Sequence, residues 1–437
     1  MEEGLRKNTT MGREKVILVA LMLPGNLKDP HDPMGELRAL IDTAGGIVVD
    51  ELIQNRRKPE SSTYIGTGKL RELAEMVTSH GAQAVVFDND LTPAQIGNIE
   101  KEVHCKVLDR SEVILDIFAA RAQTNEAKLQ VELAQLIYTY PRLRAMWSHL
   151  ERIVGGSPQG MGTRGPGEQQ LEIDRRIVKH KISVLKKLIG EIQVRKGREV
   201  ESRNKSHFTV GLVGYTNAGK STLFNTLTDA GTYADDRLFA TLSTLTRKWN
   251  LGSGDTAMLS DTVGFVRDLP HHLVASFKAT LEEAVHSDLL LILLDVSDPR
   301  ARHQYDTVME VLKDIGADTQ PRMLLLNKTG RLENNADLLV FEQEVLDALA
   351  ISAKTGKGLD VLVERVREAT RGGTQEVNIA IPLSDGKAVG FLETRAVVLS
   401  REYEGQRAVY KVRIGKRQLD QLKSSGAALE ILDNVPS

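Results

Sequence analysis

The sequence predicts an α/β protein built around a doubly wound, mostly parallel sheet. A small α/β domain with a long antiparallel helical hairpin precedes that sheet, and a small α+β domain follows it. Three observations predict this architecture: apolar runs alternate with helix-like stretches, two long apolar seams flank a glycine-rich loop, and a glycine-rich strand-to-helix turn opens the longest region. We expect four regions, residues 1–110, 111–205 with a glycine-rich loop at 155–167, 206–372 and 373–437.

The composition is that of a globular protein with two or three domains, since 437 residues with 41% hydrophobic content can bury ordinary cores. The 57 Lys and Arg nearly balance the 59 Asp and Glu, so any basic surface must be local. The single Cys105 excludes an internal disulfide and fits a reducing compartment. No run approaches the roughly 20 apolar residues of a membrane span, and the polar first residues lack a signal-peptide core, which predicts a cytoplasmic protein.

The first region alternates apolar runs with helix-like stretches such as 69–79 and 93–103. The apolar runs are 16–23, 47–52, 84–88 and 105–108. This alternation predicts a small, mostly parallel sheet covered by helices. The segment "YIGTGKL" lacks the spacing of a phosphate-binding loop. We interpret it as the turn that begins a helix, with a ligand loop as the alternative.

The second region carries two apolar seams with helical spacing, which predict an antiparallel hairpin of long helices. The first seam is Leu129, Leu133, Leu136, Tyr140, Leu143, Trp147 and Leu150, and the second is Val178, Ile182, Leu185, Ile189 and Ile192. Pro141 is expected to kink the first helix. Residues 141–205 hold 15 Lys and Arg against 7 Asp and Glu, a net charge of +8 that is either a solvated helical face or a binding surface. The tip "GMGTRGPGE" is either a flexible loop or a backbone that approaches a partner closely.

The third region opens with "FTVGLVGYTNAGKST", an apolar strand followed by a G-x-x-x-x-G-K-S turn and a helix. This is the phosphate-binding loop in the context that it requires. Its backbone N–H groups face phosphate, Lys220 neutralises the outer phosphates and Ser221 reaches Mg²⁺. The residues expected to bind nucleotide here are Gly214, Tyr215, Thr216, Asn217, Ala218, Gly219, Lys220, Ser221 and Thr222.

Two further motifs belong to the phosphate end of this site. "AMLSDTVGF" is a strand that ends in a carboxylate suited to the Mg²⁺ shell and continues to a glycine that can meet a γ-phosphate. Its expected site residues are Asp261, Thr262, Val263 and Gly264. Between the two motifs lies "RLFATLSTLTR", with Phe239, Ala240 and Thr241. The Thr241 hydroxyl suits Mg²⁺ and the attacking water, although by itself it would be an ordinary exposed threonine.

Two later strands should bring residues to the same sheet edge, because ligands bind at the carboxyl ends of strands in such sheets. "RMLLLNKTGRLEN" supplies Asn327 and Lys328, and "ALAISAKTGKGL" supplies Ser352, Ala353 and Lys354.

At this point the chain resembles a known family. The ordered set GYTNAGKS, LFATL, DTVGF, NK and SAK is similar to a translation-factor-type GTPase domain. "LQVELAQL", "RGPGEQQLEIDRR" and "DTVGFVRDLPHHLVASFKATLEEA" resemble the HflX family over about residues 14 to 372. The resemblance implies a P-loop GTPase with Lys220, Thr241, Gly264 and Asn217 in catalytic roles. It also implies Mg²⁺ held by Ser221, Thr241 and Asp261.

The same resemblance implies a partner. HflX-like proteins bind the large ribosomal subunit and split or rescue ribosomes under stress, and their hairpin contacts ribosomal RNA. The residues expected to pair with RNA phosphates are Arg144, Arg152, Arg164, Arg175, Arg176 and Lys179. We expect a monomer, and a loose membrane association stays open. The rival hypotheses are a nucleotide-gated ribosome or rRNA binding module with little hydrolytic activity, and a small-molecule phosphotransferase.

Two positions depart from the usual GTPase pattern, and a third bears on how the site hydrolyses nucleotide. Gly330 replaces the aspartate of Asn-Lys-x-Asp, which predicts relaxed base discrimination with ATP accepted beside GTP; Glu333 or Asp337 are alternative acceptors. Phe265 replaces the glutamine that orients water in many GTPases. Asn217 matches an asparagine that helps to bind K⁺ in related GTPases, or it only caps the loop.

Overall fold

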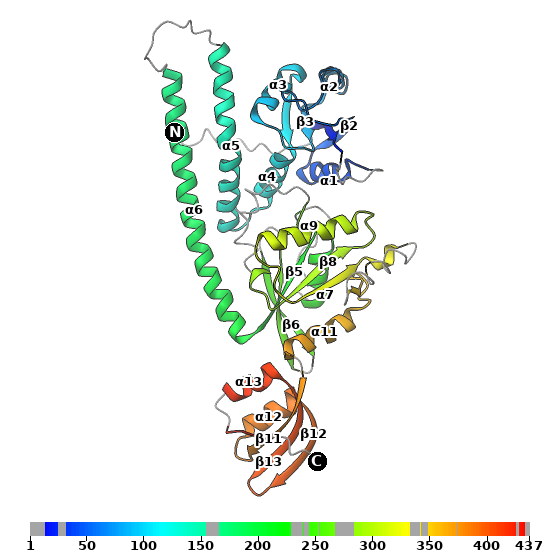
Figure 1. The fold of residues 1–437 in the computed structure, drawn as a ribbon, viewed down its shortest axis with the longest axis vertical. Coiled ribbons are helices and arrows are strands. Elements are labelled where there is room, and N and C mark those ends of the chain that lie inside the picture. Colours follow the sequence, from blue (N-terminus) through cyan, green and yellow to red (C-terminus); the bar gives the residue numbers. More distant parts are fainter. Residues whose placement is uncertain are drawn as a thin grey trace.

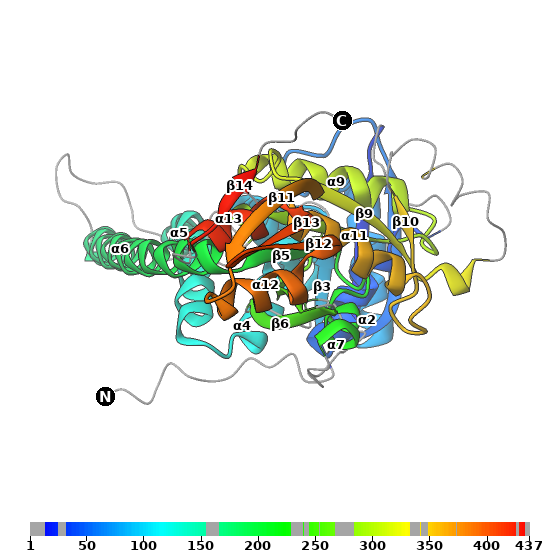
Figure 2. The same ribbon diagram turned by 90° about the horizontal axis from the view of Figure 1, so that it is seen from below.

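The described part of the chain contains three sheets and a long helical hairpin (Figure 1). The computed structural model describes residues 14–24, 32–153, 166–228, 239, 244–252, 254–266, 284–332, 341, 348–372, 374–424 and 428–432. The N-terminal domain, the central domain and the C-terminal domain follow one another along the long axis, and the hairpin runs beside the first two. Seen along that axis, the hairpin lies to one side of the molecule (Figure 2).

The N-terminal domain is a four-stranded parallel sheet of order β2-β1-β3-β4, as the alternation of strands and helices predicts. Its strands are β1 (Lys15–Met22), β2 (Ile47–Asn55), β3 (Ala84–Phe87) and β4 (Lys106–Asp109). Its helices are α1 (Gly35–Ala44), α2 (Thr67–His80), α3 (Pro93–Val103) and α4 (Arg110–Arg121). Alternate residues of β1 belong to two different cores, so this strand is buried on both faces. Helix α2 begins at Thr67, so "YIGTGKL" is the turn at the start of a helix.

The hairpin consists of α5 (Asn125–Ile153) and α6 (Pro166–Ser206), which lie side by side and run antiparallel (Figure 1). Its small core joins the two predicted seams: Leu133, Leu185 and Ile189 are buried, with Leu129, Leu136, Ile137 and Ile182 packed around them. Pro141 lies inside α5. Pro166 stands at the first residue of α6, where its missing N–H costs no helical hydrogen bond.

The central domain holds a six-stranded sheet of order β10-β9-β8-β5-β7-β6, in which β6 alone is antiparallel to its neighbour. The strands are β5 (Phe208–Gly214), β6 (Leu245–Gly252), β7 (Asp255–Asp261), β8 (Leu289–Asp295), β9 (Arg322–Asn327) and β10 (Leu349–Ala350). The helical elements are α7 (Lys220–Thr228), α9 (Ala301–Asp314), the 3₁₀ turn η1 (Thr329–Arg331) and α11 (Leu359–Arg371). Residues of β8 alternate between two cores, as expected for a doubly wound sheet.

The C-terminal domain is an antiparallel sheet of order β12-β13-β11-β14 with two helices, which confirms the predicted α+β fold. Its elements are β11 (Thr374–Pro382), α12 (Gly386–Arg395), β12 (Val397–Glu404), β13 (Arg407–Gly415), α13 (Lys416–Ser424) and β14 (Glu430–Leu432). The buried Asp255 of the central domain forms a contact with this domain. It accepts hydrogen bonds from Arg371 at 2.8 Å and from Gln418 at 2.8 Å.

Within the described ranges, no helix combines the length and the apolar character that crossing a membrane would require.

Candidate nucleotide site

The predicted motifs meet at one edge of the central sheet. Strands β5, β7, β8 and β9 are parallel, and their last residues are Gly214, Asp261, Asp295 and Asn327. The carboxyl ends of parallel strands are where such folds bind ligands. The structure therefore places the phosphate-loop, carboxylate and Asn-Lys motifs around a single space.

The phosphate loop bends tightly from β5 into α7. Gly219 has a φ of +97°, and a Cβ there would lie 2.5 Å from Asn327 Nδ2, so a side chain would clash and strain the backbone. Helix α7 begins immediately afterwards at Lys220. A helix start that follows a glycine turn directs backbone N–H groups at an anion.

Lys220 is aimed back into the loop. Its ammonium donates to the carbonyl oxygens of Gly214 at 3.1 Å and Tyr215 at 2.9 Å, and only 6% of the residue is exposed. Burial lowers the pKa of Lys220 to about 8, although Asp261 opposes the shift. A cation with so little hydration gains strongly from an anionic ligand.

Ser221 and Asp261 are hydrogen-bonded to each other beside the phosphate loop. Ser221 Oγ donates to Asp261 Oδ2 at 2.8 Å, while the buried Asp261 Oδ1 has no hydrogen-bond partner in the described part of the chain. Burial raises the pKa of Asp261, and Lys220 and Ser221 act in the opposite direction. One carboxylate and one hydroxyl beside a phosphate loop suit Mg²⁺, which takes few protein ligands and completes its shell with phosphate and water.

The segment after Asp261 closes over the phosphate loop. A Cβ on Gly264 would lie 2.9 Å from Lys220 Nζ and 2.9 Å from Thr216 Cα, so only glycine allows this approach. Phe265 pairs with the loop through its backbone: its N–H donates to Gly214 at 3.1 Å, and its carbonyl accepts from Thr216 at 2.7 Å. The Phe265 ring is buried and has no group that could orient water. Val263 is buried too. The Thr262 hydroxyl donates to the Leu212 carbonyl at 2.6 Å, so the Thr262 side chain stabilises the sheet.

Asn327 connects three segments of the site through its side-chain hydrogen bonds. Its amide donates to the Ala218 carbonyl at 2.8 Å, and its Oδ1 accepts from the Ala353 N–H at 2.9 Å. The Ala353 N–H is therefore bonded to Asn327 in this structure. Ser352 accepts from the Thr355 N–H at 3.3 Å.

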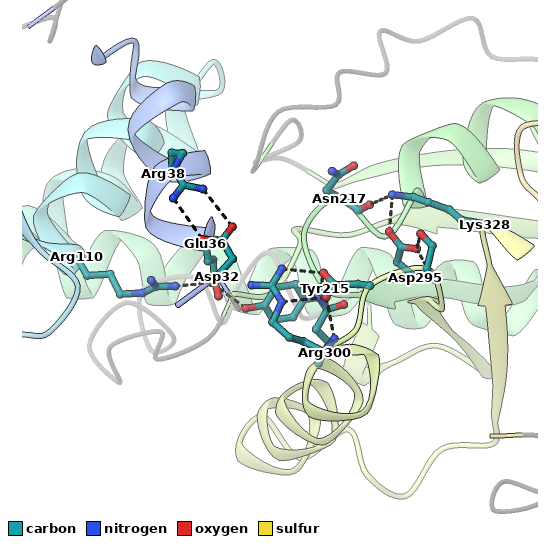
Figure 3. A network of polar contacts seen from close by, with 12 residues as sticks. Asp32, Glu36, Arg38, Arg110, Tyr215, Asn217, Asp295, Arg300 and Lys328 are labelled. Atoms are coloured by element: carbon teal, nitrogen blue, oxygen red, sulfur yellow. Dashed lines mark hydrogen bonds and ion pairs between the residues drawn. The ribbon is translucent and has the colours of Figure 1, made fainter. Parts of the chain in front are cut away.

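Lys328 follows in a left-handed conformation with φ of +63°. Its ammonium donates to the Asn217 carbonyl at 2.9 Å and pairs with Asp295 at 2.7 Å (Figure 3). Asn217 itself has a φ of +60° and an exposed side chain. Sequence reasoning missed Asp295, although its place at the carboxyl end of a buried strand was a usable signal.

Gly330 lies in η1 beside these residues. A Cβ built there meets nothing within 4 Å, and its backbone is not left-handed. An aspartate would therefore fit without strain. The suggested substitute acceptors Glu333 and Asp337 lie outside the described residues.

The structure describes only some of the remaining predicted site residues. Thr222 lies on α7, Lys354 is exposed, and Phe239 is buried with its N–H donating to Thr216 Oγ1 at 3.0 Å. Ala240 and Thr241 lie outside the described residues. On the hairpin, Arg176 and Lys179 are exposed, and Arg175 donates to the Tyr140 hydroxyl at 3.3 Å. The side chains of Arg144 and Arg152, and all of Arg164, lie outside the described part.

The N-terminal domain also contacts the phosphate loop, through Glu36 and Arg110, which no motif marks. Tyr215 donates its hydroxyl to Glu36 of α1 at 2.8 Å, and Glu36 pairs with Arg110 of α4 (Figure 3). Arg110 also pairs with the buried Asp88 at 2.7 Å. These contacts join residues that are distant in sequence, so neither periodicity nor spacing could have predicted them.

The sequence of the chain is similar to those of known proteins along most of its length. Three family models match the chain: "GTP-binding GTPase N-terminal" over residues 31–119, "GTP-binding GTPase Middle Region" over 121–203 and "50S ribosome-binding GTPase" over 209–328. GTPase HflX of Lacrimispora saccharolytica is 41% identical, covering 90% of this chain and 91% of that protein. GTPase HflX of Escherichia coli is 40% identical, covering 86% of this chain and 87% of that protein. A crystal structure of a Sulfolobus solfataricus GTP-binding protein in complex with GDP is 23% identical, covers 82% of this chain and 98% of that one, and has a TM-score of 0.43.

Proposed function

Because the chain belongs to the HflX family of GTPases and is therefore a GTP-hydrolysing enzyme, we propose that it binds the large ribosomal subunit and splits or rescues ribosomes under stress. The observation that supports this most is the presence of a phosphate-loop site and a basic hairpin in one chain. On this proposal the protein works in the cytoplasm as a monomer. We name the 50S subunit as the partner because the family model that matches residues 209–328 is described as a 50S ribosome-binding GTPase.

We assign the phosphate chemistry to the residues around Lys220. The loop from Gly214 to Thr222 holds the phosphates, Lys220 and the Gly264 N–H face the γ-phosphate, and Asn327, Lys328 and the segment 352–354 surround the base. Ser221, Asp261 and Thr241 would hold Mg²⁺, which GTPases use to neutralise charge on the β- and γ-phosphates. Lys220 is already fixed by two carbonyl oxygens, so it needs little reorganisation to stabilise charge in the transition state.

The site lacks a side chain at position 265 that could orient the attacking water, because the buried Phe265 stands where many other GTPases have glutamine. We propose that Asn217 helps to bind K⁺ beside the phosphates and that the ribosome completes the site. The isolated protein is then expected to hydrolyse GTP slowly. In KCl its turnover should exceed that in NaCl by about tenfold or more, which is modest against the effect of a single oxyanion donor.

Steady-state turnover in KCl and NaCl, with and without purified large subunits, measures both effects. Large subunits should add an acceleration of about 100-fold or more, within the range known for partner-activated GTPases. Fast turnover in NaCl without ribosomes would refute both ideas. The Asn217→Asp variant keeps the side-chain size and separates an ion effect from a loop effect.

The hairpin is the proposed RNA contact, because exposed basic side chains lie along α6. Neutralising Arg175, Arg176 and Lys179 to glutamine together is expected to weaken binding to large subunits. It should also reduce the slope of log K against log salt by about 2 to 3, since each lost phosphate contact removes about 0.7 to 0.9. Sedimentation with subunits at several salt concentrations measures the slope.

A matched control removes the same charge elsewhere. Lys58, Lys313 and Arg322 are exposed and lie off the hairpin, so changing them to glutamine should leave the slope unchanged. If both triple variants behave alike, the RNA surface is elsewhere. A small-molecule phosphotransferase would ignore ribosomes. Docking that needs the γ-phosphate, without any acceleration of hydrolysis by large subunits, would favour a nucleotide-gated binding module.

A further inference from the structure

Phe239 occupies an unusual position beside the phosphate loop. Its φ is +54°, a left-handed conformation that is rare for a bulky residue and persists only when the surroundings enforce it. Two contacts do so. The Phe239 N–H donates to Thr216 Oγ1 at 3.0 Å, and its ring meets the ring of Phe118 edge-to-face with centroids 4.6 Å apart.

Phe118 belongs to a different domain, since it lies on α4 of the N-terminal domain. It is fully buried, with 1% of the residue exposed. The same hydrophobic core also contains Tyr215, Val263 and Phe265 of the central domain. Phe239 is therefore buried in a core that the N-terminal and central domains share, and Phe118 is its contact from the N-terminal domain. Thr216, which holds the backbone of Phe239, also lies against Gly264, where a γ-phosphate would be met.

The other end of α4 is held by the hairpin. Tyr138 of α5 donates to Asp109, the N-cap of α4, at 2.6 Å, and Arg142 pairs with Asp109 at 2.6 Å and with Glu112 at 3.2 Å. The Arg142 guanidinium also stacks on the Tyr138 ring at 3.5 Å. The Arg142 and Asp109 side chains are 14% and 1% exposed, so their ion pair is largely shielded from water.

Helix α4 thus contacts the hairpin at its first turn and Phe239 near its last. We propose that Phe118 is a positioning residue that holds Phe239 against the phosphate loop, and that α4 transmits the docking of the hairpin to this contact. The inference rests on the proposed function, because it assigns the route by which the ribosome would act on the same nucleotide site. Coupling of this kind is reciprocal, so a bound triphosphate must in turn favour the hairpin position that docks.

The variant Phe118→Leu keeps an apolar side chain but loses the edge-to-face contact. Affinity for a non-hydrolysable GTP analogue is expected to fall about threefold to tenfold, the range that an aromatic pair supplies. Affinity for GDP should stay unchanged, because GDP has no γ-phosphate to meet Gly264. The acceleration of hydrolysis by large subunits should fall by a similar factor while sedimentation with subunits persists.

Two further variants test the structural alternative and the route. Phe87→Leu changes a buried ring of the other N-terminal core, away from Phe239, and should leave the ratio of analogue to GDP affinity intact. Arg142→Gln should reduce the acceleration by subunits as Phe118→Leu does. The double variant should be no worse than the more affected single one, because both changes act on one helix.

Several results would overturn the inference. An equal loss of analogue preference in Phe87→Leu would show that Phe118 acts only through the stability of its domain. Additive losses in the double variant would show that α4 is not the route. If wild-type protein is accelerated by subunits and Phe118→Leu is accelerated equally, the inference alone fails. A wild-type protein that subunits do not accelerate overturns the proposed function together with the inference.

Discussion

Replacing Lys220 with alanine is expected to lower GTP turnover by about 100-fold to 10,000-fold. The ammonium has three N–H donors, so it would release one of its two loop carbonyls and donate two charged hydrogen bonds to the outer phosphates. Each of these bonds is worth about 1.5 to 3 kcal/mol, and every 1.4 kcal/mol is about tenfold. The structure strengthens the expectation, since two loop carbonyls already hold the side chain and burial lowers its pKa to about 8. A phosphate would add to the counter-charge of Asp261, which alone leaves the pKa of Lys220 below its usual value.

The fold should survive this change, because Lys220 contacts its own loop and the ligand space rather than an apolar core. Circular dichroism melts should show a folded protein, while GDP should raise the melting temperature of wild type more than that of the variant. Lys220→Met retains the aliphatic stem if alanine proves unstable. Lys313→Ala on the exposed face of α9 is the matched control and should keep full turnover. Normal turnover in both Lys220 variants would show that the phosphate site has been misassigned.

The second large effect concerns the base. We propose that the chain discriminates guanine from adenine weakly, because Gly330 stands where an aspartate carboxylate would accept two hydrogen bonds from guanine. Losing both would cost about 3 to 6 kcal/mol, or about 100-fold to 10,000-fold in preference. The phosphate and Mg²⁺ contacts do not depend on the base. ATP should therefore be accepted comparably, and GTP should bind less tightly than in GTPases that keep the aspartate.

The structure leaves room for a mutation that restores the missing acceptor. A Cβ at Gly330 meets no atom within 4 Å, so Gly330→Asp can restore the acceptor without a clash. Competition between GDP and ADP should show little preference in wild type and a GDP preference of about 100-fold or more in the variant. Gly330→Asn has the same size without the charge and should gain much less. A strong GDP preference in wild type that Gly330→Asp does not deepen would point to another acceptor.

The sequence predicted local features of the fold well. Alternating apolar runs predicted the N-terminal strands, and the leucine spacing of α5 and α6 predicted the residues that meet in the hairpin core. Each of these depends on periodicity within one element. The short β14 was not predicted, because three residues carry no periodic signal and the strand forms only by pairing with β11.

Contacts between distant segments were beyond sequence reasoning for a physical reason. Glu36 and Tyr215 are 179 residues apart, and nothing near either one signals the other. The pairing of Phe118 with Phe239 likewise arises only after two domains share a core. The motif residues could be grouped in advance because parallel strands bring their carboxyl ends together, whereas the partner of Ala353 depends on side-chain orientation.

The central claim is that the nucleotide site governs attachment to the large ribosomal subunit. The most direct test is sedimentation of the full chain with purified large subunits in a non-hydrolysable GTP analogue, in GDP and without nucleotide. The account predicts that the chain sediments with the subunits in the analogue and largely stays in the supernatant in GDP. Equal sedimentation in all three conditions, or none in any of them, would contradict it.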